Sequence, residues 1–154
     1  MSPDRMKAVA AIAIALAAPA EGLRRVAYYD PPGILTVCRG HTGPDVVKNK
    51  VYSLAECDKF MTDDMRKAVL IVERCHPNLP VNVHAAFSDA VFNMGSPVAC
   101  NSTASKYLDV GNYLAACNQL PRWNKAKIMG VYVTLPGLVT RRAEEVEVCL
   151  EGLE

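Results

Sequence analysis

The sequence contains no uninterrupted apolar run of about twenty residues, no CxxC pair, no nucleotide-binding glycine loop and no large excess of charge of either sign. A permanent transmembrane helix needs about twenty apolar residues, so none is predicted. Without CxxC pairs the commonest metal and thiol-redox motifs are excluded, and we expect neither a metal site nor a cofactor. The 17 basic and 16 acidic residues nearly cancel, so nothing indicates nucleic acid as a partner. The length of 154 residues suggests one domain with a sizeable core.

Six cysteines are evenly spread along the chain. An even number of separated cysteines in a chain of this size indicates a disulfide framework and an oxidising compartment. The alternative is six buried thiols in a cytosolic protein, where cysteine packs as a small hydrophobic residue. The six are Cys38, Cys57, Cys75, Cys100, Cys117 and Cys149.

The N-terminal run Ala8–Ala20 carries no charge and follows the basic residues Arg5 and Lys7. One hypothesis is a secretory signal, cleaved after Ala18-Pro19-Ala20, which would leave Glu21 without a helix to position it. A second hypothesis is a buried helix of the fold, although such a helix should show charge on one face. A third is a weak signal-anchor, too short and too alanine-rich to stay in a bilayer. The basic residues before the run predict a cytoplasmic N-terminus, and the second and third hypotheses are compatible.

The next stretch predicts a small β-hairpin. Val26–Tyr29 and Ile34–Val37 are β-prone segments, and Pro31-Pro32-Gly33 between them is a turn signal. Glu21 precedes this hairpin, Asp30 ends its first strand, and Thr36 lies on its return strand. Such a layout holds two carboxyl groups on opposite sides of a groove, which is the arrangement that glycoside hydrolysis uses.

The remainder of the chain is mainly helical. We expect a loop from His41 to Lys50, a long helix after the capping box Ser53–Glu56, and a second helix ended by Gly95. The fold class is therefore α+β, with a small β lobe and a mainly helical lobe joined by the long helix. The other predicted starts are Ser102 and Asn112 for two short helices, and Thr140 for a last helix over Arg141–Leu150 after a loop at Leu135–Gly137.

This order of elements favours disulfides between neighbouring cysteines, out of the fifteen pairings that six cysteines allow. Each would close a loop of moderate length and stabilise the fold by roughly 3–4 kcal/mol. The predicted pairs are Cys38–Cys57, Cys75–Cys100 and Cys117–Cys149.

The sequence resembles the phage-type lysozymes of glycoside hydrolase family 24. The family motif has a glutamate, an aspartate nine residues later and a threonine six further, which here are Glu21, Asp30 and Thr36. Other matching motifs are Gly40 to Thr42, Phe92 to Gly95, Ser102-Thr103, Arg122-Trp123 and Gly137 to Arg142.

This resemblance implies hydrolysis of the β-1,4 bond between N-acetylmuramic acid and N-acetylglucosamine in peptidoglycan. Glu21 would be the general acid, and it must keep its proton near neutral pH, most simply by partial burial. Asp30 would activate water or stabilise the cationic transition state, and Thr36 would hold the water or Asp30. Arg142 aligns with a family arginine that orients the acid.

Other residues have weaker assignments. Asn93 is a candidate for substrate contact or a helix cap, and His41 is expected to form structural hydrogen bonds. Arg141 is expected to be structural or solvated.

The alanine-rich start and the cysteines are also similar to the signal-anchor-release endolysins of that family. Residues 1–20 would then be an apolar helix or anchor, and residues 21–154 the catalytic domain. The expected protein is a monomeric endolysin in the host periplasm, bound transiently to the inner membrane through residues 8–20 before release. The run Ala8–Ala20 has no cysteine, so activation by thiol exchange is not expected. The alternatives are a non-catalytic murein-binding module, a lytic transglycosylase, and a lysozyme whose first helix is never in the membrane.

Overall fold

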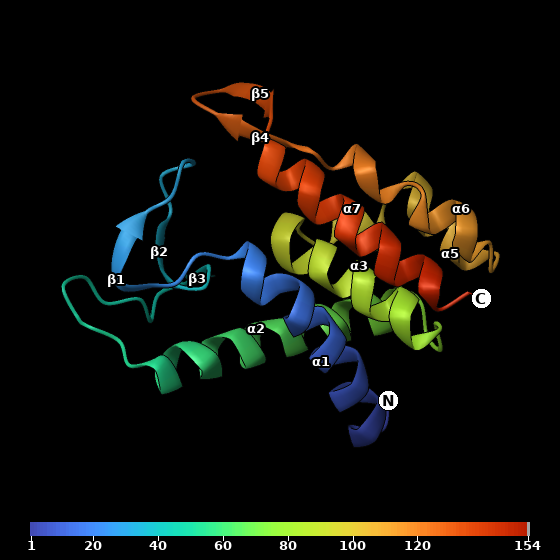
Figure 1. The fold of residues 1–154 in the computed structure, drawn as a ribbon, viewed down its shortest axis with the longest axis horizontal. Coiled ribbons are helices and arrows are strands. Elements are labelled where there is room, and N and C mark those ends of the chain that lie inside the picture. Colours follow the sequence, from blue (N-terminus) through green and yellow to red (C-terminus); the bar gives the residue numbers. More distant parts are fainter. Residues whose placement is uncertain (154) are drawn as a thin grey trace.

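A computed structural model describes residues 1–153 and confirms an α+β architecture with two lobes. A small three-stranded sheet forms one lobe, the long helix α2 runs between the lobes, and the other helices gather around α3 (Figure 1). The elements are α1 Pro3–Ala20, β1 Arg24–Tyr29, β2 Leu35–Cys38, β3 His41–Thr42, α2 Leu54–Cys75, α3 Val81–Met94, α4 Pro97–Cys100, α5 Thr103–Asp109, α6 Tyr113–Cys117, the 3₁₀ helix η1 Leu120–Arg122, β4 Lys125–Ile128, β5 Val131–Thr134 and α7 Pro136–Glu151.

The predicted hairpin is confirmed as the antiparallel pair β1–β2, in which Tyr28 lies opposite Thr36. Asp30 closes its turn, because its side chain accepts a hydrogen bond of 2.7 Å from the amide of Ile34. One detail differs from the expected loop after the hairpin. His41 and Thr42 form the short strand β3, which pairs with β2 and completes the sheet.

Helix α1 is a core helix of the large lobe, as the second hypothesis for the N-terminus predicts. Its buried residues recur every three or four positions and face α3 and α2. The opposite face carries alanines, which expose little apolar area. This explains how a helix without charges for several turns lies at the surface of the fold. The buried residues are Met6, Val9, Ala10, Ala13, Leu16 and Ala17.

Polar contacts fix the two ends of α1. Ser2 caps its first turn, and Arg5 donates a hydrogen bond to the carbonyl of Leu79, at the loop before α3. At the other end the amide of Glu21 donates to the carbonyl of Ala17. Within residues 1–153, no helix is both long enough and apolar enough to cross a membrane.

The last part of the chain differs from prediction in two ways. Helix α7 begins at Pro136 and not after Thr140, because proline is well suited to the first position of a helix, where no amide partner is needed. A second hairpin, β4–β5, was not predicted. Its two turn residues, Met129 and Gly130, have φ of +50° and +82°, the combination that tight hairpin turns require. The alternation of KAKI before this turn was the available signal.

All three predicted disulfides are confirmed. Cys38–Cys57 joins the sheet to α2, and Cys75–Cys100 joins the end of α2 to α4. Cys117–Cys149 joins α6 to the end of α7. The first bridge therefore connects the sheet lobe to α2, and the other two connect helices within the large lobe.

Candidate active site

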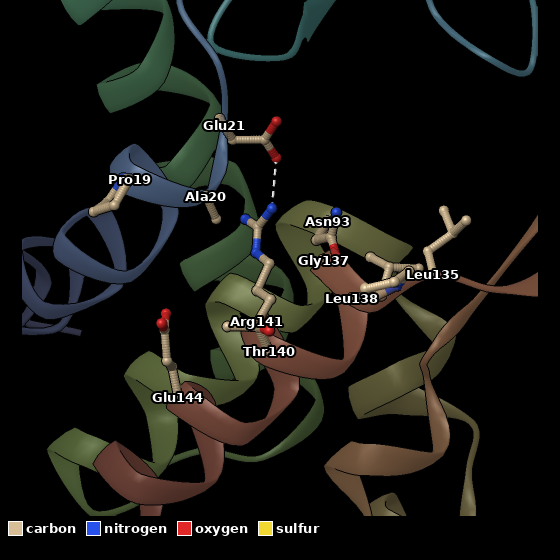
Figure 2. A pocket seen from close by; sticks show the side chains of 11 residues that line it. Pro19, Ala20, Glu21, Asn93, Leu135, Gly137, Leu138, Thr140, Arg141 and Glu144 are labelled. Carbon is tan, nitrogen blue, oxygen red and sulfur yellow. Dashed lines mark hydrogen bonds and ion pairs between the residues drawn. The ribbon is translucent and has the colours of Figure 1, made fainter.

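Glu21 stands at the end of α1, where the chain leaves the helical lobe for the sheet. Its side chain is 22% exposed, which agrees with the partial burial expected of a general acid. It lines an open cleft of about 680 Å³ together with Asn93 from α3 and residues of the first turns of α7. Figure 2 shows the carboxyl group directed over this cleft from the end of α1.

Arg141 holds the carboxyl group of Glu21. Its Nη1 donates a hydrogen bond of 2.7 Å to Oε1 of Glu21 (Figure 2). The rest of the guanidinium is bound by Asp89 on α3, at 3.1 Å from Nε and 2.8 Å from Nη2. Asp89 is fully buried and Arg141 is 5% exposed. Burial alone would lower the pKa of Arg141, but hydrogen bonds and charge from Asp89, together with Glu21, raise it.

The ion pair with Asp89 changes the charge that Arg141 presents to Glu21. Because Asp89 forms a two-bond ion pair with Arg141, much of the positive charge is already balanced. Arg141 therefore orients Glu21 while presenting less than a full charge to it.

The prediction that Arg142 orients Glu21 is wrong, because Arg141 forms the hydrogen bond to Glu21. Of the two expectations for Arg141, the solvated one is wrong, since its side chain is 5% exposed. Arg142 is fully buried and pairs with Glu145 on the same helix, at 2.5 Å. Its Nη2 also donates a hydrogen bond of 2.8 Å to Oδ1 of Asn93. Successive residues of a helix point about 100° apart, so only one of the two arginines faces Glu21. The structure assigns that place to Arg141.

Asn93 lies at the cleft, as its candidate role requires. Its carbonyl oxygen is taken by Arg142, and Figure 2 shows its nitrogen on the side of the cleft. This orientation presents an N–H donor to whatever occupies the cleft. Its use in substrate binding remains a prediction.

Asp30 and Thr36 do not line the cleft. Both belong to the β1–β2 hairpin, which lies on one side of the end of α1, while the start of α7 lies on the other (Figure 1). Asp30 is half-buried at the hairpin turn. Thr36 is 3% exposed, and its hydroxyl donates a hydrogen bond of 2.9 Å to the carbonyl of Ile34. Its hydrogen-bond donor is thus used within the strand, which leaves the oxygen as an acceptor.

Tyr28 lies on β1 and was not predicted as a site residue. Burial raises the pKa of its phenol, Arg24 opposes this, and the negative charges of Glu21 and Asp30 raise it further. The guanidinium of Arg24 lies 4.3 Å from the centre of the ring. Tyr28 therefore lies within the electrostatic reach of both carboxylates. The sequence indicated it only as a strand residue, and in the sheet it lies opposite Thr36.

His41 is a structural hydrogen-bonding residue, as predicted. Its Nδ1 lies 2.7 Å from Asp64 on α2, and its Nε2 lies 2.8 Å from Asp45. The ring also stacks on Phe60 with centroids 3.8 Å apart. Burial lowers the pKa of His41, but hydrogen bonds and charge from the two aspartates outweigh it and raise the pKa above its usual value. His41 fixes the sheet to α2 and does not reach the cleft residues.

Gly40 approaches Glu21 from the β2–β3 turn. A Cβ placed on Gly40 would lie 3.0 Å from Oε2 of Glu21, and its φ of +84° is also unfavourable for other residues. Glycine at this position therefore permits the carboxyl group to lie against the turn. This contact explains why the motif Gly40 to Thr42 begins with a glycine.

Comparison with known proteins identifies the family. Residues 18–145 match the family model described as phage lysozyme. The "SAR-endolysin" of Enterobacteria phage P21 is 33% identical over an alignment of 170 residues that covers 99% of each chain.

Solved structures agree with this. The active form of the P1 phage endolysin Lyz has a TM-score of 0.74 at 29% identity, covering 93% of this chain and 85% of that one. The secreted inactive form of the same protein has a TM-score of 0.50 at 29% identity, covering 73% and 78%. The chain belongs to the phage lysozyme family, and it is a glycoside hydrolase, an endolysin of the muramidase type that degrades the host cell wall.

Proposed function

We propose that Glu21 is the general acid of this muramidase, that Asp30 is its second carboxylate, and that Thr36 supports Asp30 or the attacking water. The observation that carries the proposal is the position of Glu21, partly buried over the cleft and held at 2.7 Å by an arginine whose charge Asp89 balances. A general acid must be fixed beside the leaving oxygen and must keep its proton until that oxygen needs it.

In this mechanism Glu21 protonates the oxygen of the β-1,4 bond as the bond breaks. Asp30 acts from the hairpin beside the cleft and stabilises the oxocarbenium-like centre directly or through a water that it activates. The acceptor oxygen of Thr36 binds that water. Asn93 donates a hydrogen bond to the substrate in the cleft.

A comparison of Glu21→Gln with Glu144→Gln tests the acid. Glu144 also lines the cleft, but it lies on α7 and is exposed, so its loss removes a similar charge without removing the proposed proton donor. Lysis is followed as the loss of turbidity of chloroform-treated Gram-negative cells. Glu21→Gln should lose at least about 10²-fold in rate, since general acid catalysis contributes about 10²–10⁴-fold. Equal rates for Glu21→Gln and the unmodified protein would end the assignment.

The products separate the rival activities. Mass spectrometry of digested murein should find reducing ends. Anhydro ends would indicate a lytic transglycosylase, and binding to murein without new ends would indicate a non-catalytic module.

We further infer that the protein acts in the host periplasm and is held first at the inner membrane through residues 8–20. The support is the uncharged alanine-rich segment, its position directly before Glu21, and the "SAR-endolysin" relatives. While this segment lies in a membrane it cannot pack on α3, and Glu21 loses the helix end that places it over the cleft. The greater likeness to the active than to the secreted inactive P1 endolysin suits a docked α1 as the working form.

Export without a holin tests this route. In cells lacking any holin, the protein should reach the periplasmic side of the inner membrane and remain with carbonate-washed membranes. It should leave them when the membrane potential is collapsed. If the membranes of de-energised cells retain all the protein, the release step is refuted. If the protein stays in the cytoplasm without a holin, the first helix is a permanent part of a soluble lysozyme.

A further inference from the structure

The β4–β5 hairpin extends from the large lobe beyond the start of α7 (Figure 1). Every residue of β5 is exposed, and Tyr132 is 70% exposed. The base of the hairpin is closed by a hydrogen bond of 3.0 Å from the amide of Leu135 to the carbonyl of Asn124. Leu135 also lines the cleft of Glu21, so the hairpin begins at the rim of that cleft.

The hairpin has one basic face and one apolar face. Residues directly opposite each other in a sheet share a face, and neighbours along a strand alternate between faces. The lysines of β4 are exposed, whereas its aliphatic residues are half-buried, so the basic face is the one turned toward solvent. The basic face consists of Lys125, Lys127, Tyr132 and Thr134, and the apolar face of Ala126, Ile128, Val131 and Val133.

The segment that contains the hairpin carries positive charge only. Between Asp109 and Glu144 the chain has no aspartate or glutamate, although it has 16 acidic residues in all. The exposed cations of this segment are Arg122, Lys125 and Lys127. No ion pair within residues 1–153 includes any of these three. No carboxylate of the segment cancels their charge, so the three cations attract an external anion.

The substrate of a muramidase supplies such an anion. N-acetylmuramic acid carries a peptide on its lactyl group, and this stem peptide has free carboxylates. An extended peptide covers up to about 3.3–3.6 Å per residue, so about four residues reach about 13 Å. Strand β4 has 4 residues and also spans about 13 Å. A stem peptide that starts in the cleft is therefore long enough to reach the lysines of the hairpin.

We propose that the basic face of the β4–β5 hairpin binds the carboxylates of the murein stem peptide, and that the enzyme therefore prefers glycan that carries peptides. Lys125 and Lys127 pair with the carboxylates, and the hydroxyl of Tyr132 donates a hydrogen bond to the same groups. The inference rests on the proposed function, in which Glu21 stands at the scissile bond. An anionic membrane also attracts cations, but the position of the hairpin at the rim of the cleft favours murein.

Three double variants test the role of the charge. Lys125→Gln with Lys127→Gln removes both charges and leaves exposed polar side chains on the hairpin. Lys125→Arg with Lys127→Arg keeps both charges. Lys59→Gln with Lys106→Gln is the matched control, because these two lysines are exposed and lie on α2 and α5.

The substrates are soluble glycan chains with their peptides and the same chains stripped of peptides by an amidase, and reducing-end release gives kcat and KM. The glutamine pair should raise KM about 3–10-fold on the peptide-bearing chains, with kcat within about twofold, because each exposed ion pair contributes modestly. On the stripped chains KM should not change. The arginine pair and the control should match the unmodified protein on both substrates. An unchanged KM on the peptide-bearing chains, or an equal rise on both substrates, would overturn the inference.

Vesicles of phosphatidylglycerol and phosphatidylcholine test a membrane as the alternative partner. If the glutamine pair loses binding to these vesicles in sedimentation and keeps its KM on peptide-bearing chains, the basic face is a membrane-docking surface and the inference is wrong. Glu21→Gln keeps the two proposals apart, since its kcat tests the acid while the ratio of KM between the two substrates tests the hairpin. If Glu21→Gln is fully active, the proposed function fails, and the KM ratio still decides what the hairpin binds.

Discussion

The contact between Gly40 and Glu21 leads to a quantitative prediction for Gly40→Ala. The substitution places a methyl group 3.0 Å from Oε2 and 3.3 Å from Cδ of Glu21, in a backbone conformation with φ of +84°. Forcing a residue with a Cβ into that conformation costs about 1–2 kcal/mol of folding free energy. In addition the carboxyl group must move by a few tenths of an ångström, which stretches its 2.7 Å bond to Arg141.

A displacement of about 1 Å at a reacting group costs roughly 10²-fold in rate, so a shift of a few tenths should cost several-fold to about tenfold in kcat. The control is Gly111→Ala, at φ of +72° between α5 and α6, where nothing lies within 4 Å of the new methyl group. It should lose a similar 1–2 kcal/mol of stability and keep its kcat.

Urea unfolding gives the stability of both variants, and reducing-end release from purified sacculi at a temperature where both are folded gives kcat. The reasoning is refuted if Gly40→Ala keeps the full kcat, or if the two variants lose activity in equal proportion. In the second case backbone strain, and not contact with Glu21, would explain the loss.

Three further predictions concern the support of the site. The folded protein raises the pKa of His41, so the protonated ring stabilises the fold. This stabilisation is complete below the unfolded pKa near 6.5 and is lost as the pH rises through the folded pKa. His41→Gln should therefore destabilise the protein more at pH 6 than at pH 9 in urea unfolding. Replacing Cys75 and Cys100 together by alanine opens a loop of 25 residues and should lower the free energy of unfolding by about 3–4 kcal/mol, with kcat unchanged for the folded fraction. Arg5→Ala removes the hydrogen bond between α1 and the loop before α3 and should cost about 1–3 kcal/mol in thermal or urea unfolding, with little change in kcat because Glu21 lies at the other end of α1. An equal loss of stability for His41→Gln at both pH values would contradict the first prediction. Normal stability without the disulfide would contradict the second, and a loss of kcat in folded Arg5→Ala would contradict the third.

Local sequence signals predicted much of the fold. The capping box at Ser53, the glycine stop at Gly95 and the side-chain caps at Ser102 and Asn112 lie at helix ends in the structure. Each signal acts within one turn of its own helix, which is why it can be read without the rest of the chain. The β4–β5 hairpin was missed because its tight turn at Met129 has no asparagine or aspartate to indicate it. The early start of α7 was missed because Thr140 was read as its cap, whereas Pro136 occupies the first position of the helix.

The N-terminal segment shows where local pattern alone is ambiguous. An uncharged alanine-rich run suits a signal, an anchor or a core helix. Only packing against α3 and α2 distinguishes the buried stripe from the exposed alanines. The same small side chains serve both environments, since alanine exposes little apolar area in water and leaves no polar group in lipid.

The sequence by itself determined the family of this protein and its disulfides: the glycoside hydrolase motif is recognisable by residue type and spacing, and the cysteine pairs by their order along the chain. The tertiary structure decided which side chains support that chemistry. Arg141 and Arg142 are adjacent in sequence, yet the rotation of α7 against α3 turns one toward Glu21 and Asp89 and the other toward Glu145 and Asn93. That rotation follows from the packing of the whole helix and the residue at which it begins. No local pattern around the two arginines contains that information.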